Sequence, residues 1–174
     1  GWGVVAADTS AKCGLDVVKL SDKTLSIIQK ILPPWWSPGN PVDMVAGNID
    51  GAMRKILEVL LEAPETDCLL LLGVVGLLKM GPMRGPDDPQ AVESHIQNMV
   101  EELLTAYDEV NELAHQYQKP VVTATEVPFA IGDLEERLYY AVGKQGFALY
   151  RNPAPAAEVL AHLVNYGKAI KAGA

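Results

Sequence analysis

The chain has 174 residues, of which 49% are apolar and 21% charged, and its formal net charge is −8. This length and composition indicate one globular domain with a substantial core, and they exclude a disordered chain. The acidic balance argues against nonspecific binding to nucleic acid or anionic lipid, because both require clustered Lys and Arg.

The first part of the chain shows helix and strand patterns in alternation. An Ala-rich stretch opens it, and Gly14 then stands where a left-handed residue would close a helix. Prolines and capping residues divide the rest. The predicted elements are a helix over 4–13, a strand over 15–20, a helix from Ser21 to Pro33, a strand over 41–47 and a helix from Asn48 to Leu60.

The second part continues the alternation with a continuous apolar run, CLLLLGVVG, which is typical of a parallel strand buried on both faces. The predicted elements are this strand over 68–76, a long helix from Asp88-Pro89 to Tyr117, a strand over 119–125, a helix over 131–146, a strand over 147–151 and a helix from Asn152-Pro153 to about Ala169. This order predicts a three-layer α/β domain with a mainly parallel sheet. A helix comes first, so the strand that normally opens such a domain is missing.

Residue patterns for self-contained catalysis are not found in the sequence. The three histidines lack partners at metal-ligand spacing, and neither a GxSxG turn nor a P-loop is present. Cys13 and Cys68 lie outside any CxxC pair, so we expect two buried free thiols. The longest apolar run has 11 residues and the first residues lack signal-peptide features, which predicts a soluble, cytoplasmic protein without a membrane span.

Binding residues are expected where the strands end, since helix N-termini bind anions there. Gly1–Val4 place two glycines around a tryptophan at the start of the first helix, which favours either an anion site or a tight turn. Lys79 and Arg84 stand on a long Gly/Pro-rich loop and are candidates for contacts with phosphate or a partner domain. Gly47 and Asn48 stand at a predicted strand-to-helix turn, and capping is the favoured role for Asn48, Thr125 and Glu126.

Three short motifs occur in order: GWGVVAAD at residues 1–8, GL at residues 14–15 where the predicted strand begins, and NPVD at residues 40–43. With them the chain resembles the C-terminal flavodoxin-like domain of NDP-forming acyl-CoA synthetases, the ADP-forming acetate–CoA ligase branch of the succinyl-CoA synthetase superfamily. The specific motifs lie in residues 1–47, and the rest of the chain matches in the order of its elements. The resemblance implies a single flavodoxin-like domain over 1–174 that is a fragment of a larger enzyme.

The resemblance further implies that the whole enzyme converts acyl-CoA, ADP and phosphate to carboxylate, CoA and ATP through a phosphohistidine. The CoA-binding, phosphohistidine and ATP-grasp domains would be partners outside this chain, together with the ATP or ADP, Mg and CoA that they bind. This domain would supply a helix N-terminus as the phosphate station, through backbone N–H groups that neutralise the phosphoryl group. Carried across, the station is Gly1, Trp2, Gly3 and Val4, and the isolated chain would be inactive.

The sequence departs from the family pattern at Trp2, where a smaller residue is usual, and in lacking the preceding strand. The alternative function is a free-standing flavodoxin-like binding or regulatory domain. A phospho-receiver would need an acidic pair at the end of its first strand, and a flavin carrier would need a Ser/Thr-rich phosphate loop. Neither feature is found in this sequence. A third interpretation is an interaction module that uses Trp35-Trp36 as a partner patch or anchors that loop under the sheet edge.

Overall fold

The computed structural model describes residues 1–44, 51–73, 89–125 and 134–173. Within these ranges all six predicted helices form, and three of the five predicted strands form. In chain order the elements are α1 (Trp2–Lys12), α2 (Asp22–Ile31), α3 (Ala52–Glu62), β1 (Leu69–Leu72), α4 (Pro89–Tyr117), β2 (Val121–Ala124), α5 (Leu134–Lys144), β3 (Leu149–Tyr150) and α6 (Pro153–Gly173).

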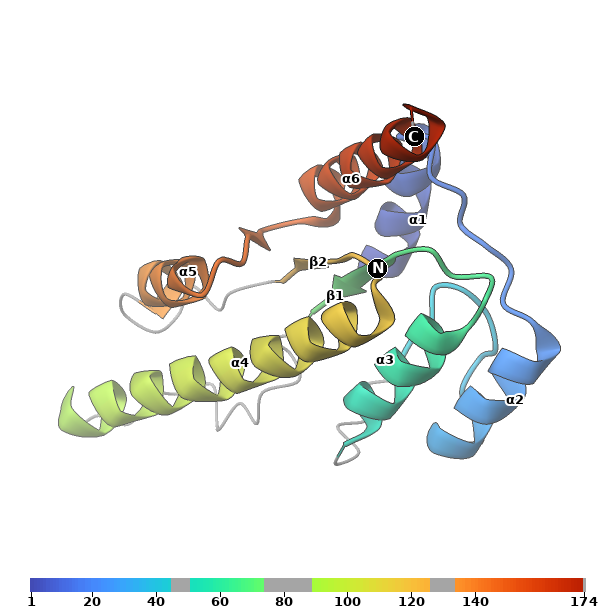
Figure 1. Ribbon diagram of the computed structural model, residues 1–174. Helices are drawn as coiled ribbons and strands as arrows, with labels where there is room; N and C mark the ends of the chain where they lie inside the picture. Colours follow the sequence, from blue (N-terminus) through green and yellow to red (C-terminus); the bar gives the residue numbers. More distant parts are fainter. Residues whose placement is uncertain (45–50, 74–88, 126–133, 174) are drawn as a thin grey trace.

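The three strands form an all-parallel sheet in the order β1-β2-β3, with Leu69 opposite Val121 and Thr123 opposite Leu149. Helices α1 and α6 cover one face, and α3, α4 and α5 cover the other, while α2 packs on the outer side of α3 (Figure 1). The predicted three-layer α/β architecture is therefore confirmed.

Side chains of β1 alternate between the two layers, as the two-residue period of a strand requires. Leu70 and Leu72 contact the cluster shared with α6, and Leu69 and Leu71 contact the cluster shared with α3 and α4. A strand with helices on both faces needs apolar residues at every position, which accounts for the continuous leucine run. The predicted parallel strand forms over Leu69–Leu72, with its four residues half-buried rather than buried.

The strands predicted over 15–20 and 41–47 do not form in the part of the chain that the structure describes. Residues 15–20 have no regular secondary structure and pair with no described strand, and the carbonyl oxygen of Val18 accepts a hydrogen bond from Asn40 Nδ2 at 3.0 Å. Residues 41–44 are irregular, and 45–47 lie outside the described residues. Leu20 packs into the cluster between α2 and α3, so this segment is held by side-chain packing rather than by a ladder.

Several helix ends match the signals predicted for them. Gly14 has φ +81°, and the bonds from Leu15 N–H to Ser10 O and from Gly14 N–H to Ala11 O close α1 as a Schellman motif. Ser21 Oγ caps α2, and Asn152 Oδ1 accepts from Ala154 N–H at the start of α6. The N-cap predicted at Asp88 lies outside the described residues.

The two adjacent tryptophans, Trp35 and Trp36, differ in burial. Trp36 is buried among α2 and α3 side chains, whereas Trp35 is 72% exposed. The loop is therefore anchored by Trp36 and exposes Trp35 to solvent.

Cys13 and Cys68 are free thiols, as predicted. Both are only half-buried, whereas the sequence predicted that they would be buried.

A carboxylate that is distant in sequence fixes the start of α2. Glu65 Oε1 accepts hydrogen bonds from Ser21 N–H and from Thr24 Oγ1, both at 2.8 Å. The Ser21 N–H bond is the largest cause that lowers the pKa of Glu65 from 4.5 to about 2. Glu65 thereby holds α2 against the connection between α3 and β1, at the helix end where negative charge is favourable.

We expect Glu65→Gln to lower the thermal unfolding midpoint at pH 7, because it removes the charged acceptor at this helix end. The folded-state pKa is depressed, so the stabilisation is present above about pH 4.5 and is lost as pH falls toward 2. Thermal melts of parent and variant between pH 2 and pH 7 should therefore converge at the acidic end. Glu62→Gln, an exposed substitution on α3, controls for the loss of one charge, and a difference independent of pH would contradict the prediction.

Candidate functional site

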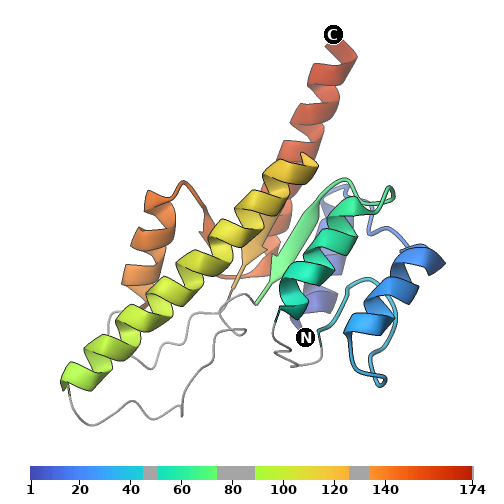
Figure 2. The same ribbon diagram turned by 60° about the horizontal axis from the view of Figure 1, so that its bottom comes forward.

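The carboxyl ends of β1 and β2 lie at the same end of the molecule as the N-termini of α1, α3 and α4 (Figure 2). This follows from parallel strands that are each followed by a returning helix. The end of the sheet where anions are expected is thus built as the sequence predicts.

The first turn of α1 presents backbone donors without a side-chain cap. Gly1 is the N-cap residue, and its carbonyl accepts from Val4 N–H at 3.2 Å. The N–H groups of Trp2 and Gly3 have no acceptor within the helix, as is general for the first residues of a helix. The first turn carries no acidic side chain, so its partial positive charge is not neutralised by its own residues.

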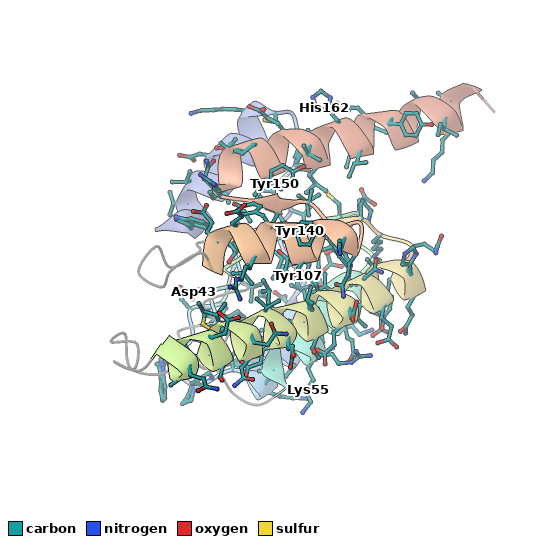
Figure 3. All side chains as sticks on the ribbon, turned by 90° about the vertical axis from the view of Figure 1, so that its left-hand side faces the viewer. Asp43, Lys55, Tyr107, Tyr140, Tyr150 and His162 are labelled. Atoms are coloured by element: carbon teal, nitrogen blue, oxygen red, sulfur yellow. The ribbon has the colours of Figure 1, made fainter. Side chains whose placement is uncertain are left out.

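The turn at residues 40–43 lies directly against this helix start. A Cβ added at Gly3 would meet Pro41 Cβ and Cγ at 3.4 Å, so Gly3 allows the proline ring to approach α1 closely. The Asn40-Pro41 peptide bond is cis, and Asn40 anchors the turn through Val18. Asp43 lies at the end of the molecule from which α4 starts (Figure 3). The NPVD motif therefore packs against the helix start through the Pro41 ring.

Trp2, the residue that departs from the family pattern, packs on the sheet. It is half-buried and contacts the cluster of Val122, Ala124 and Leu160. Its ring thus anchors α1 to the face that α1 shares with α6. A large side chain at this position does not by itself block the backbone donors, because the indole is directed toward the core.

The polar residues at the end of β2 are satisfied inside the protein. Tyr107 Oη and Thr123 Oγ1 lie 2.7 Å apart, and burial raises the pKa of Tyr107 to about 12. Thr125 is fully buried, and its N–H donates to Tyr150 O at 2.9 Å. Figure 3 shows Tyr107 between α4 and α5. These residues stabilise the sheet, and Thr123 and Tyr150 also line a hollow away from the α1 start.

The remaining predicted positions cannot be placed together with the α1 start. Lys79 and Arg84 lie outside the described residues, as do Gly47, Asn48 and Glu126. Among the residues that are described, no group of three His, Cys, Asp or Glu side chains could hold a metal ion. None of the helices searched in the described ranges is long and apolar enough to cross a membrane.

A hollow of about 210 Å³ lies elsewhere, between α4, α6 and the segment before β3. Val121, Phe147 and Leu163 are among its mainly apolar lining residues. They belong to the start of β2, the approach to β3 and the middle of α6, so the hollow lies toward the opposite end of the sheet from the α1 start.

Sequence reasoning missed the contact between the two motifs and the anchoring role of Trp2. Gly3 and Pro41 are 38 positions apart, and neither residue type indicates which distant residue it will contact. The signal available was that both belong to the resemblance motifs, which indicated that the two stretches matter without showing that they touch.

Comparisons with known proteins match the whole chain to part of longer ones. The chain is 28% identical over 173 residues to the acetate–CoA ligase [ADP-forming] II subunit alpha of Pyrococcus furiosus, and the match covers 99% of this chain and 33% of the relative. No protein-family model matches the chain. The resemblance to ADP-forming synthetases is confirmed by this homologue, and the chain spans about a third of the length of the relatives that it matches.

Solved structures with the same fold give the same picture. A crystal structure of a Pyrococcus horikoshii protein has a TM-score of 0.64 at 24% identity and covers 95% of this chain and 33% of its own. The dinucleotide-forming acetyl-coenzyme A synthetase 1 of Ca. Korarchaeum cryptofilum, in complex with phosphate and ADP, has a TM-score of 0.63 at 21% identity, covering 97% of this chain and 31% of its own. At these identities the likeness shows the fold, which is that of a domain within a larger chain.

Proposed function

We propose that residues 1–174 form the flavodoxin-like domain of a cytoplasmic NDP-forming acyl-CoA synthetase. The observation that carries this proposal is the full-length match to one third of an ADP-forming acetate–CoA ligase subunit. In this proposal the CoA-binding, phosphohistidine and ATP-grasp domains are other parts of the synthetase, and ATP or ADP, Mg and CoA are bound there.

Within that enzyme we assign the start of α1 as a phosphate station that receives a phosphorylated histidine from another domain. Three features support this assignment: the uncapped donors of Trp2 and Gly3, the absence of acidic side chains in the first turn, and the position at the strand carboxyl ends. Val4 and Val5 beside them are 64% and 49% exposed, and they offer an apolar contact for an incoming domain.

The chemical logic is that backbone donors stabilise a phosphoryl group without competing for it. A helix start provides N–H groups and partial positive charge but no nucleophile. The phosphoryl group can therefore be held during transfer and remain on histidine until the acceptor is aligned. The isolated chain should be inactive, because it supplies this station and no group that transfers phosphate or binds CoA.

Two assays test the proposal separately. Purified 1–174 should form no ATP from acyl-CoA, ADP and phosphate. Measurable turnover would contradict the proposal that the catalytic groups lie on other domains. In the whole synthetase, Gly3→Pro removes one backbone donor from the first helical turn, where proline is tolerated. We expect phosphoryl transfer to slow by about 10²-fold, the usual effect of losing one such donor.

Gly3→Ala is the matched control, because it adds a methyl group next to Pro41 and keeps the N–H. Thermal melts of both variants report whether the turn remains packed. If both variants transfer phosphate at equal rates while folding normally, the station is wrong but the assignment to a synthetase stands.

A further inference from the structure

We infer that α6 joins two copies of this chain, by packing antiparallel against α6 of the second copy through an apolar stripe on its outer face. The stripe consists of Val159, Leu163, Tyr166 and Ile170. The inference follows from how α6 packs within this domain and does not depend on the phosphate station.

The C-terminal half of α6 projects beyond the rest of the domain. The buried side chains of α6 all lie in its first half: Pro153, Ala156, Ala157, Leu160 and Ala161. Residues 162–173, here called the projecting half, include no buried side chain. Figure 2 shows α6 continuing past the end of α4 and past the strands. Helices in proteins are stabilised mainly by tertiary packing, so the last turns of α6 lack their usual support.

The four stripe residues lie on one face of α6, because they are spaced four, three and four positions apart. Leu163, Tyr166 and Ile170 are 45%, 68% and 53% exposed, and Val159 is half-buried. Within the described residues α6 contacts chiefly α1 and the three strands, and these contacts leave the stripe exposed. Large apolar side chains at this spacing are typical of a helix that packs against another helix.

The spacing of the stripe fits a second copy of the same helix, since it reads the same in both directions. An antiparallel copy brings Ile170 of one chain opposite Val159 of the other, and Tyr166 opposite Leu163. Every stripe residue then meets an apolar partner about a single two-fold axis. Each projecting half also lies along the supported half of the other α6. A parallel copy would leave both projecting halves beyond both domains, so the antiparallel arrangement is favoured.

The domain offers an apolar surface where the projecting half of the other copy would lie. Val159 and Leu163 line the hollow of about 210 Å³, and Val110 and Ala114 line it from α4. The stripe therefore runs from this hollow out onto the projecting half. A second α6 on the stripe would cover apolar surface beside the hollow, which favours association. One face of the molecule thus carries both an apolar projection and an apolar surface that receives it.

Charge favours the same arrangement. All 22 acidic residues of the chain precede the projecting half, which carries Lys168 and Lys171. The basic end of one copy would lie along the acidic domain of the other, and opposite potentials across an interface promote association. The stripe contains no charged residue, so its burial leaves no charge without a partner. The net charge of −8 on each copy and the small contact surface predict a weak dimer.

Sedimentation velocity of 1–174, from micromolar to near-millimolar concentration, tests the inference. We expect a reversible equilibrium between monomer and dimer. Tyr166→Glu places a charge in the middle of the stripe and should weaken dimerisation by at least about tenfold. Tyr140→Glu is the matched control, because Tyr140 is 65% exposed and lies on α5, outside the stripe (Figure 3). This control should leave the equilibrium unchanged, and thermal melts should show that both variants fold.

Disulfide cross-linking reports how the two helices are oriented. Leu163→Cys and Tyr166→Cys proteins, mixed and oxidised, should form a dimer whose disulfide joins position 163 of one chain to position 166 of the other. Each variant oxidised alone should cross-link much less, because an antiparallel pair keeps identical positions apart. The parent chain, oxidised in the same way, measures any cross-linking through Cys13 and Cys68.

Three results would overturn the inference. They are a monomer at every concentration, dimerisation that Tyr140→Glu weakens as much as Tyr166→Glu does, and Leu163→Cys alone cross-linking as efficiently as the mixture. The last result would mean that the helices pair in parallel. None of these results bears on phosphoryl transfer, so the proposed function stands or fails by its own assays.

Discussion

We expect Leu103→Ala to lower the free energy of unfolding by about 2–5 kcal/mol. Leu103 is fully buried in the middle of α4 and belongs to the cluster with Tyr107 and Leu138. The truncation removes buried methyl groups and leaves a cavity, because α4 and α5 are held in place by their other contacts. Few of its neighbours can move to fill the space, so the loss should lie well above that of an average substitution.

Urea unfolding monitored by circular dichroism measures this loss, with the dependence of the free energy on urea unchanged. Leu104→Ala is the matched control, since Leu104 is the next residue of the same helix and is only half-buried. Equal losses for the two variants would show that the α4 core is not packed as described.

The second large effect concerns the buried hydroxyl pair of Tyr107 and Thr123. The two residues are 1% and 4% exposed. Tyr107→Phe leaves the Thr123 hydroxyl buried without its partner, and Thr123→Val does the same to the phenol. Each single variant should lose about 1–3 kcal/mol, because a buried polar group without a hydrogen bond carries its desolvation cost.

The double variant distinguishes a real pair from two independent sites. With both hydroxyls removed no polar group is left unsatisfied, so the loss should be well below the sum of the two single losses. Urea unfolding of all four proteins gives the coupling. Additive losses would mean that the 2.7 Å contact contributes nothing specific.

Local patterns predicted the fold where they act over a few residues. The leucine run of β1, the Schellman glycine after α1 and the caps of α2 and α6 all formed as expected. The segment 15–20 did not become a strand, because a strand requires a neighbouring backbone as well as suitable residues. The same reason accounts for β3, whose ladder with β2 is only two residues long.

Contacts between distant residues set the limit of prediction. Glu65 meets Ser21 across 44 positions, and Lys119 Nζ donates to Leu61 O and Ala63 O at the end of α3. The sequence around a charged side chain does not indicate which distant helix end that side chain will cap. The candidate site shows the same limit, since its helix start was predictable and its packing against Pro41 was not.

The placement of Trp2 gives the domain a built-in optical reporter. Its half-buried indole packs against the sheet, while Trp35 is exposed and Trp36 is buried in a separate cluster. In a Trp35→Phe, Trp36→Phe background the remaining fluorescence comes from the ring that anchors α1. Movement of α1 away from the sheet would then shift the emission to longer wavelength, so docking events at this helix can be followed in solution without an added dye.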